Sequence, residues 1–219
     1  MNKKPENWEV VMTKEQIEVL RTDPRFAGIL TLARTLNALM FCNQVLIEGK
    51  NDNKPAASRQ RMTAILISAG VLYEALDAAE KTAKELGTHV SYKELEKLLD
   101  DPRTVKLRSK ALLRLRNQIA FHFDRKIASK TLKDLDLQSY QFQTGLGPSR
   151  GTTYYQLADE VAINYLLKVV NPIGDESETL KELLTEIAWL VSSYIETADH
   201  LIANVLNDMG WTLQEREQF

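Results

Sequence analysis

The sequence predicts an all-α protein, an up-and-down helical bundle, and three observations carry that prediction. Apolar residues recur at three-and-four spacing along nearly the whole chain, which is the pattern of amphipathic helices. Only 9 glycines and 6 prolines interrupt the 219 residues. The strongest β-like fragment, residues 140–143, is too short to define a sheet. With 44% hydrophobic and 26% charged residues, the chain is expected to form a single helical domain over residues 1–219.

Two long helices are expected first, and together they form a helical hairpin. Asp23 and Pro24 combine an N-cap residue with a proline at the first helical position, so a helix begins there and ends at Gly49. Ser58 is the expected cap of the second helix, whose apolar pattern continues to Gly87. Because a short connection joins them, the two helices are expected to be antiparallel neighbours.

A short helix and a long basic helix follow the hairpin. Ser91 and Glu94 have the spacing of a capping box and introduce the short helix. Asp101-Pro102 repeats the cap-then-proline start, and the helix after it runs without glycine or proline to near Ser129. Residues 23–130 are therefore the expected core, made of the hairpin and this long helix.

The C-terminal part is expected to add a loop and further helices. Residues 138–154 are predicted to be a flexible loop, because they hold the only glycine-rich stretch of the chain. That stretch lacks the Lys-Ser/Thr of a phosphate-binding P-loop. Residues 155–210 are predicted to form additional bundle helices, one ending at Asn171-Pro172 and one beginning near Asp175.

Charge is distributed very unevenly along the chain. The formal net charge is −2, yet residues 103–133, here called the basic segment, hold ten Lys or Arg and one acid. Residues 134–219 hold fourteen acids and four bases. Such a segment either pairs with acidic neighbours or forms a surface for a polyanion such as RNA. The expected RNA-binding residues are cations of this segment: Arg108, Lys110, Arg114, Arg125 and Lys126.

The candidate catalytic residues lie in the same segment. Arg116, Asn117 and His122 place a fixed cation, a neutral polar group and an imidazole within two helical turns. Arginine can hold a phosphate through paired N–H bonds, and histidine can exchange a proton near neutral pH. Arg116 is expected on the apolar face of its helix. It therefore either pairs with an acid of a neighbouring helix or borders a cleft, since an unpaired buried cation is costly.

No metal site or cofactor is expected. The sequence lacks His-Glu-x-x-His, EF-hand, paired-cysteine and glycine-rich nucleotide patterns, so a metal-independent mechanism without cofactors is implied. His89 and His200 are expected at the surface.

The expected location is the cytoplasm, without a membrane partner. A single cysteine, Cys42, among apolar neighbours favours a reducing compartment. No stretch approaches the ~20 consecutive apolar residues of a membrane span, and the start of the chain lacks a signal-peptide pattern.

Residues 115–124 resemble the signature of the HEPN superfamily. That signature is an arginine, usually followed by a polar residue, with four to six positions before a histidine. Arg116 matches the arginine, Asn117 the polar residue and His122 the histidine, with five residues between Arg116 and His122. The preceding hairpin and basic helix agree with the up-and-down bundle of the family.

This resemblance implies a bundle of HEPN type with additional C-terminal helices, and a metal-independent endoribonuclease. The enzyme would be a homodimer with a composite active site where two motif helices meet. His122 would be the acid or base, Arg116 would hold the scissile phosphate, and Asn117 would orient one of them. The ribose 2′-OH would attack the phosphate and leave a cyclic phosphate.

Relatives of this kind also suggest a biological setting and an alternative. Many are toxins, abortive-infection proteins or RNA-processing domains, which implies phage defence, toxin–antitoxin or stress response, with an antitoxin or regulatory protein as a further partner. Asp124 stands where toxins silenced by a nucleotidyltransferase carry a tyrosine, so that modification is not expected. Other members have lost catalysis, and the alternative is a non-catalytic nucleotide-binding or protein-interaction module.

Overall fold

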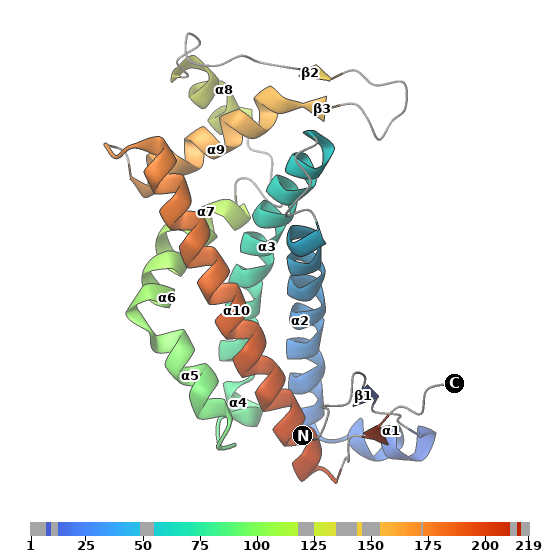
Figure 1. Ribbon diagram of the computed structural model, residues 1–219. Helices are drawn as coiled ribbons and strands as arrows, with labels where there is room; N and C mark the ends of the chain where they lie inside the picture. Colours follow the sequence, from blue (N-terminus) through green and yellow to red (C-terminus); the bar gives the residue numbers. More distant parts are fainter. Residues whose placement is uncertain are drawn as a thin grey trace, which may run out of the picture.

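The protein is all-α, as predicted. The computed structural model describes residues 8–9, 13–48, 55–117, 125–134, 144–145, 154–171, 173–210 and 214–215. Within these ranges the chain is helical apart from two pairs of two-residue strands. The long helices run along one common axis and give an elongated bundle (Figure 1).

The predicted helical hairpin forms the centre of the bundle. Helix α2 spans Pro24–Glu48 and helix α3 spans Pro55–Lys81. They lie side by side and run in opposite directions (Figure 1). Asp23 caps α2 as expected, because its carboxylate accepts a hydrogen bond from the backbone N–H of Arg25 at 2.9 Å. Apolar side chains of both helices meet in the main core, among them Leu32, Leu36, Leu39, Leu72 and Leu76.

The second helix of the hairpin differs from the prediction at both ends. It begins at Pro55 rather than after Ser58, because proline is itself favourable in the first turn of a helix. It ends at Lys81, and the short helix α4 (Ala83–Leu86) continues after a turn at Thr82. The Thr82 hydroxyl donates to the Ala79 carbonyl oxygen at 2.8 Å, a side-chain contact that competes with regular helical bonding.

The predicted short helix and the start of the basic helix are confirmed. Helix α5 spans Tyr92–Asp100 and helix α6 spans Pro102–Leu107. Asp101 caps α6 by accepting from the backbone N–H of Arg103 at 2.7 Å. The Ser91 hydroxyl does not cap α5. It accepts instead from the Asn204 amide nitrogen at 2.9 Å, so a long-range contact replaces the expected local one.

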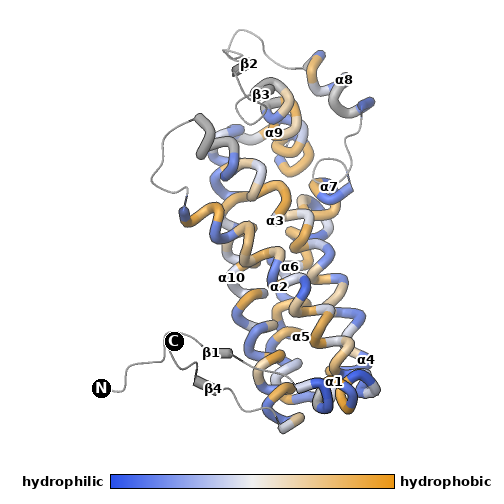
Figure 2. The backbone as a smooth tube through the Cα atoms, turned by 90° about the vertical axis from the view of Figure 1, so that its right-hand side faces the viewer, coloured by the Kyte–Doolittle hydropathy of each residue, from blue (hydrophilic) through white to orange (hydrophobic). Residues whose placement is uncertain are grey.

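The last predicted helix is the longest in the described chain and closes the bundle. Helix α10 spans Glu176–Asp208, and Asp175 caps it by accepting from the backbone N–H of Glu178 at 2.9 Å. Its apolar stripe packs against α2, α3 and α5. The hydrophobic and hydrophilic residues that produce such stripes alternate along the helices (Figure 2). The buried residues of α10 include Leu183, Leu190, Leu201 and Val205.

Two helices lie at one end of the bundle, here called the upper end as drawn in Figure 1. Helix α8 spans Arg125–Asp134 and helix α9 spans Gln156–Val170, as predicted for α9. They pack against each other, and α9 lies across the bundle axis (Figure 1). Strands β2 (Thr144–Gly145) and β3 (Tyr154–Tyr155) pair antiparallel. The other residues of the predicted loop 138–154 lie outside the described ranges.

A short helix at the opposite end was not predicted. Helix α1 spans Lys14–Leu20. Its apolar face is small, since Ile17 and Val19 are 44% and 73% exposed while Leu20 packs with Phe26 in a small second cluster. Strand β1 (Trp8–Glu9) pairs antiparallel with strand β4 (Gln214–Glu215).

Two helices reach the length and hydropathy of a membrane span, namely Pro24–Glu48 and the Gln60–Lys81 part of α3. No run of consecutive apolar residues in the sequence is long enough for such a span. These helices instead reach a high mean hydropathy although polar residues interrupt their apolar ones. Core helices of soluble proteins meet the same criterion. A cytoplasmic location and the absence of a membrane partner therefore stay predictions.

A buried tyrosine joins three of the long helices. The Tyr194 hydroxyl, on α10, lies 2.9 Å from the Thr35 hydroxyl of α2 and donates to the Ala75 carbonyl oxygen of α3 at 3.2 Å. Burial raises the pKa of Tyr194 to about 12, against an ordinary value of 10. The folded protein therefore holds Tyr194 with its hydroxyl protonated.

We expect Tyr194→Phe to lower the free energy of unfolding by about 1–3 kcal/mol, because it leaves buried hydrogen-bonding groups without a partner. It should also change how the free energy of unfolding falls at alkaline pH. The folded state holds the Tyr194 proton more tightly than the unfolded state, so its contribution is complete below about pH 10 and is lost as the pH rises toward 12. Urea denaturation across this pH range should show a smaller alkaline loss in the variant, and an equal loss would contradict the role of Tyr194.

Candidate functional site

The basic segment is helical but not uniformly α-helical where the structure describes it. Helix α6 continues into a π-helical stretch, η1 (Arg108–Leu112), and then into helix α7 (Leu113–Leu115). The backbone widens again to π-helical at Arg116 and Asn117. Both widenings fall on a helix that carries candidate functional residues, and π-helical turns are often found at functional sites.

Arg116 is held by an acid of the neighbouring helix α3. Its Nε donates to Glu74 Oε1 at 2.6 Å, and its Nη1 donates to Asn117 Oδ1 at 2.8 Å. The Arg116 side chain is 35% exposed and that of Glu74 is 43% exposed. Of the two alternatives left open by the sequence, pairing with a neighbouring acid is therefore the one observed. Nε and one N–H of Nη1 make these bonds, and none of the described residues accepts a hydrogen bond from Nη2.

His122 lies in residues 118–124, outside the described residues. The structure thus brings together Arg116 and Asn117 of the three candidate catalytic residues and does not describe the third. The composite active site of two chains stays a prediction, as does the continuity of one helix from Pro102 to Ser129. Helix α8 itself passes Ser129 and ends at Asp134.

Arg108 and Arg103 make ion pairs within the bundle. Arg108, expected to bind RNA, contacts both carboxylate oxygens of Glu80, with Nη2 to Oε2 at 2.9 Å, and lies over the Tyr73 ring. Arg103 donates to both carboxylate oxygens of Glu186 at 3.0 and 3.1 Å and stacks 3.8 Å from the centre of the Trp189 ring. Hydrogen bonds to these carboxylates raise the pKa of both arginines. These contacts are the pairing with acidic neighbours that the sequence left open.

The other expected RNA-binding residues fall into two places. Lys110 and Arg114 are exposed on η1 and α7, and the described residues provide no ion pair for either. Arg125 and Lys126 lie on α8, where they line an open hollow of about 760 Å³ together with Ser129, Lys130 and Lys133. The five expected residues therefore do not form one cluster.

Sequence reasoning missed two kinds of residue. Lys130 and Lys133 belong to the lining of the hollow. They are included in the charge of the basic segment but not among the expected RNA-binding residues. The spacing of residues 125, 126, 129, 130 and 133, which puts them on one helical face, was the signal that could have found them. Glu74 was missed as the partner of Arg116, although acids at positions 74, 77 and 80 recur every three residues along α3.

The remaining histidines bind α10 to the rest of the bundle. His89 Nε2 lies 3.0 Å from Asp208 Oδ2, and its Nδ1 accepts from the backbone N–H of Ser91 at 3.2 Å. Its side chain is 14% exposed, so it is half-buried where the loop before α5 meets α10 through His89–Asp208 and Ser91–Asn204. His200 is exposed as expected and contacts Glu94 at 3.1 Å.

No cluster of metal-ligating side chains occurs among the residues that the structure describes: no group of three or more His, Cys, Asp or Glu could hold an ion there. Cys42 is buried, and burial raises the pKa of its thiol, which disfavours the nucleophilic thiolate.

Comparison with known proteins adds no relative. No protein-family model, curated protein or solved structure matches the chain. The likeness to the HEPN superfamily consequently depends on the motif residues and the helical fold.

We expect Arg116→Gln to lower the free energy of unfolding by less than about 1 kcal/mol, because ion pairs as exposed as Arg116–Glu74 contribute little. Urea denaturation of this variant, of Glu74→Gln and of the double variant would measure the pair. A loss above about 3 kcal/mol would contradict this assignment and would give Arg116 the role of a buried charge.

Proposed function

We propose that the chain is a metal-independent endoribonuclease of HEPN type, with Arg116, Asn117 and His122 as its catalytic residues. The observation that carries the proposal is the fixed orientation of Arg116. Glu74 holds its Nε and Asn117 holds its Nη1, while none of the described residues accepts from Nη2, whose donors would contact a phosphate. A cation held in place before the substrate arrives stabilises developing negative charge without reorganisation.

In the proposed reaction, His122 takes the proton of a ribose 2′-OH. The 2′-oxygen attacks the adjacent phosphorus, and the bond from phosphorus to the 5′-oxygen of the next nucleotide breaks. That oxygen receives a proton from water, His122 returns its proton to solvent, and the products are a cyclic phosphate and a 5′-hydroxyl end. Arg116 contacts the phosphate oxygens, and Asn117 orients Arg116 through their hydrogen bond.

A homodimer is part of the proposal. On a regular helix, positions six residues apart diverge by about 120°, so Arg116 and His122 of one chain converge poorly on one phosphate. Two chains can supply both groups to a shared cleft. We place the enzyme in the cytoplasm, in phage defence, toxin–antitoxin function or the stress response, with RNA as its substrate and an antitoxin or regulatory protein as a further partner.

A second candidate function is a non-catalytic nucleotide-binding or protein-interaction module. The same ion pair favours it, because Glu74 offsets the charge with which Arg116 would attract a phosphate. In this alternative, Arg116 and Glu74 only join the basic segment to α3.

We expect wild-type protein to cut labelled total RNA in EDTA and to leave cyclic-phosphate ends. His122→Ala should lower the cleavage rate by about 10²–10⁴-fold, since this is what a general acid or base contributes. Arg116→Gln should also abolish most cleavage. The matched control is His200→Ala, which removes an exposed histidine of α10 and should leave cleavage unchanged.

Cleavage by His122→Ala at the wild-type rate and with the same ends would overturn the assignment of His122. If no protein cuts RNA while all remain folded, the non-catalytic module is the better description. Circular dichroism spectra of each variant provide the check on folding.

A further inference from the structure

The cations of the basic segment divide into two groups by what they contact. Arg103, Arg108 and Arg116 pair with carboxylates of α3 or α10. On α8, by contrast, Arg125, Lys130 and Lys133 have no acidic partner among the described residues. Lys106, Lys110 and Arg114 are exposed and also have no acidic partner among the described residues, but they are interspersed with the three paired arginines. The unpaired cations of α8, in contrast, line one open hollow.

The α8 cations share one face of their helix. Positions 125, 129 and 133 follow each other at four-residue spacing, and Lys130 lies beside them, so all line the same open hollow. Arg125 and Lys133 are eight residues apart, roughly 12 Å along the helix axis. Thr131, on the other side, is 4% exposed, and α8 packs against α9. The cationic face consequently points to solvent.

The position of α8 relates it to the candidate catalytic residues. Helix α8 lies at the upper end of the molecule, above α7, in both perpendicular views (Figures 1 and 2). Arg116 directly follows α7. A polyanion on α8 is therefore at the same end of the bundle as the proposed phosphate-binding arginine.

The composition of α8 limits how it can recognise a nucleic acid. Residues 125–134 contain no aromatic side chain on which a base could stack. Lysine and arginine without such a platform bind phosphates, and phosphate contacts carry no sequence information. Binding through this face is therefore independent of sequence and strongly dependent on salt.

We propose that the backbone of an RNA strand binds along the outward face of α8, with Arg125, Lys130 and Lys133 each contacting a phosphate. The paired arginines of the 103–116 part contact carboxylates of α3 and α10 instead. The choice of RNA as the polyanion rests on the proposed function, whereas the location of the binding face rests on the charges of α8.

The test is fluorescence anisotropy of the full chain with a short labelled 2′-O-methyl oligouridine, which lacks the attacking hydroxyl and cannot be cut. Three phosphate contacts predict a slope of log affinity against log salt of about −2, so affinity should fall about 20-fold between about 50 and 200 mM salt. In Lys130→Gln/Lys133→Gln one contact remains. The slope should then be about −0.7 and the fall about threefold.

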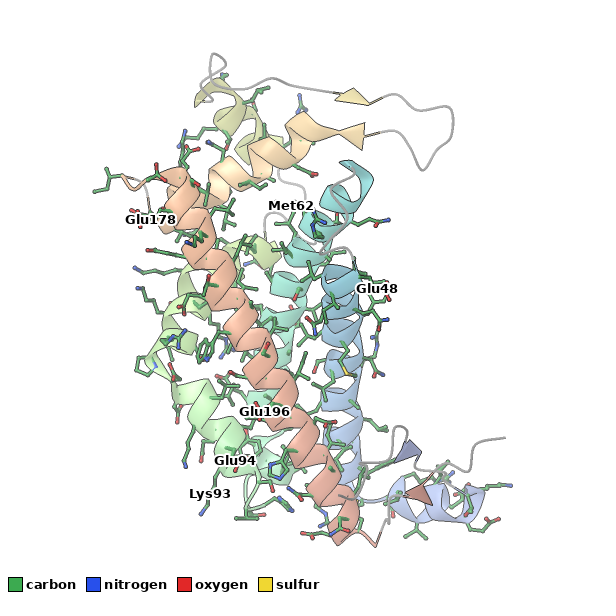
Figure 3. The ribbon with its side chains drawn as sticks, in the orientation of Figure 1. Glu48, Met62, Lys93, Glu94, Glu178 and Glu196 are labelled. Carbon is green, nitrogen blue, oxygen red and sulfur yellow. The ribbon has the colours of Figure 1, made fainter. Side chains whose placement is uncertain are left out.

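Two double variants serve as comparisons that remove the same charge. Lys93→Gln/Lys97→Gln changes two exposed lysines of α5, at the opposite end of the bundle, where Lys93 is labelled (Figure 3). It should keep the wild-type slope. Lys110→Gln/Arg114→Gln changes the exposed cations of the 103–116 part and should also keep most of the slope.

The proposal is overturned if the α8 variant keeps the wild-type slope, or if the Lys110/Arg114 variant loses as much as the α8 variant. It is also overturned if a labelled polyglutamate binds wild-type protein while the oligouridine does not, since an acidic protein is then the partner. These readouts do not involve cleavage. Binding at α8 without cleavage of ordinary RNA would refute the proposed nuclease and leave the binding face standing. If instead the wild type and the α8 variant cut ordinary RNA equally well, the binding face would be refuted and the nuclease would stand.

Discussion

The packing of the basic segment against α3 is the constraint that orders the charges of this part of the molecule. A segment with ten cations and one acid repels itself. Its buried Leu107, Leu112 and Leu115 pack into the main core, and acids meet its cations there. Glu74 pairs with Arg116, and Glu80 pairs with Arg108. Acids six residues apart on α3 thus face arginines eight residues apart on the segment. The pairing fixes how that segment lies against α3 and which way Arg116 faces.

This arrangement separates two uses of positive charge that the sequence alone cannot distinguish. When an arginine pairs with a carboxylate, the two charges largely cancel, and the pair attracts an anionic ligand only weakly. An unpaired lysine keeps its full attraction for phosphate. Arg116 lies between these limits, since its Nε is paired with Glu74 while none of the described residues accepts a hydrogen bond from its Nη2. Stability and recognition are therefore distributed over different residues of one continuous basic segment, so each can be changed with limited effect on the other.

Local chemistry explains what could be predicted from the sequence. Asp23, Asp101 and Asp175 each cap the expected helix, because a cap involves only residues two or three positions apart. The features that were missed depend on distant residues. Ser91 and Glu94 have capping-box spacing, but Ser91 contacts Asn204 and Glu94 contacts His200. Likewise, the partner of Arg116 lies 42 positions away, and a pattern within one helix carries no signal for it.

The π-helical stretch η1 adds a different kind of constraint to the segment. A π turn accommodates one residue more than an α turn, so every residue after Leu112 is rotated relative to a continuous α-helix, by about 100° for each added residue. The position of Arg116 opposite Glu74 therefore depends on the number of residues before it as well as on their identity. Chains descended from a common ancestor with this one should exchange side chains in η1 readily but should seldom gain or lose a residue there. Length, more than composition, would be the conserved property of this stretch.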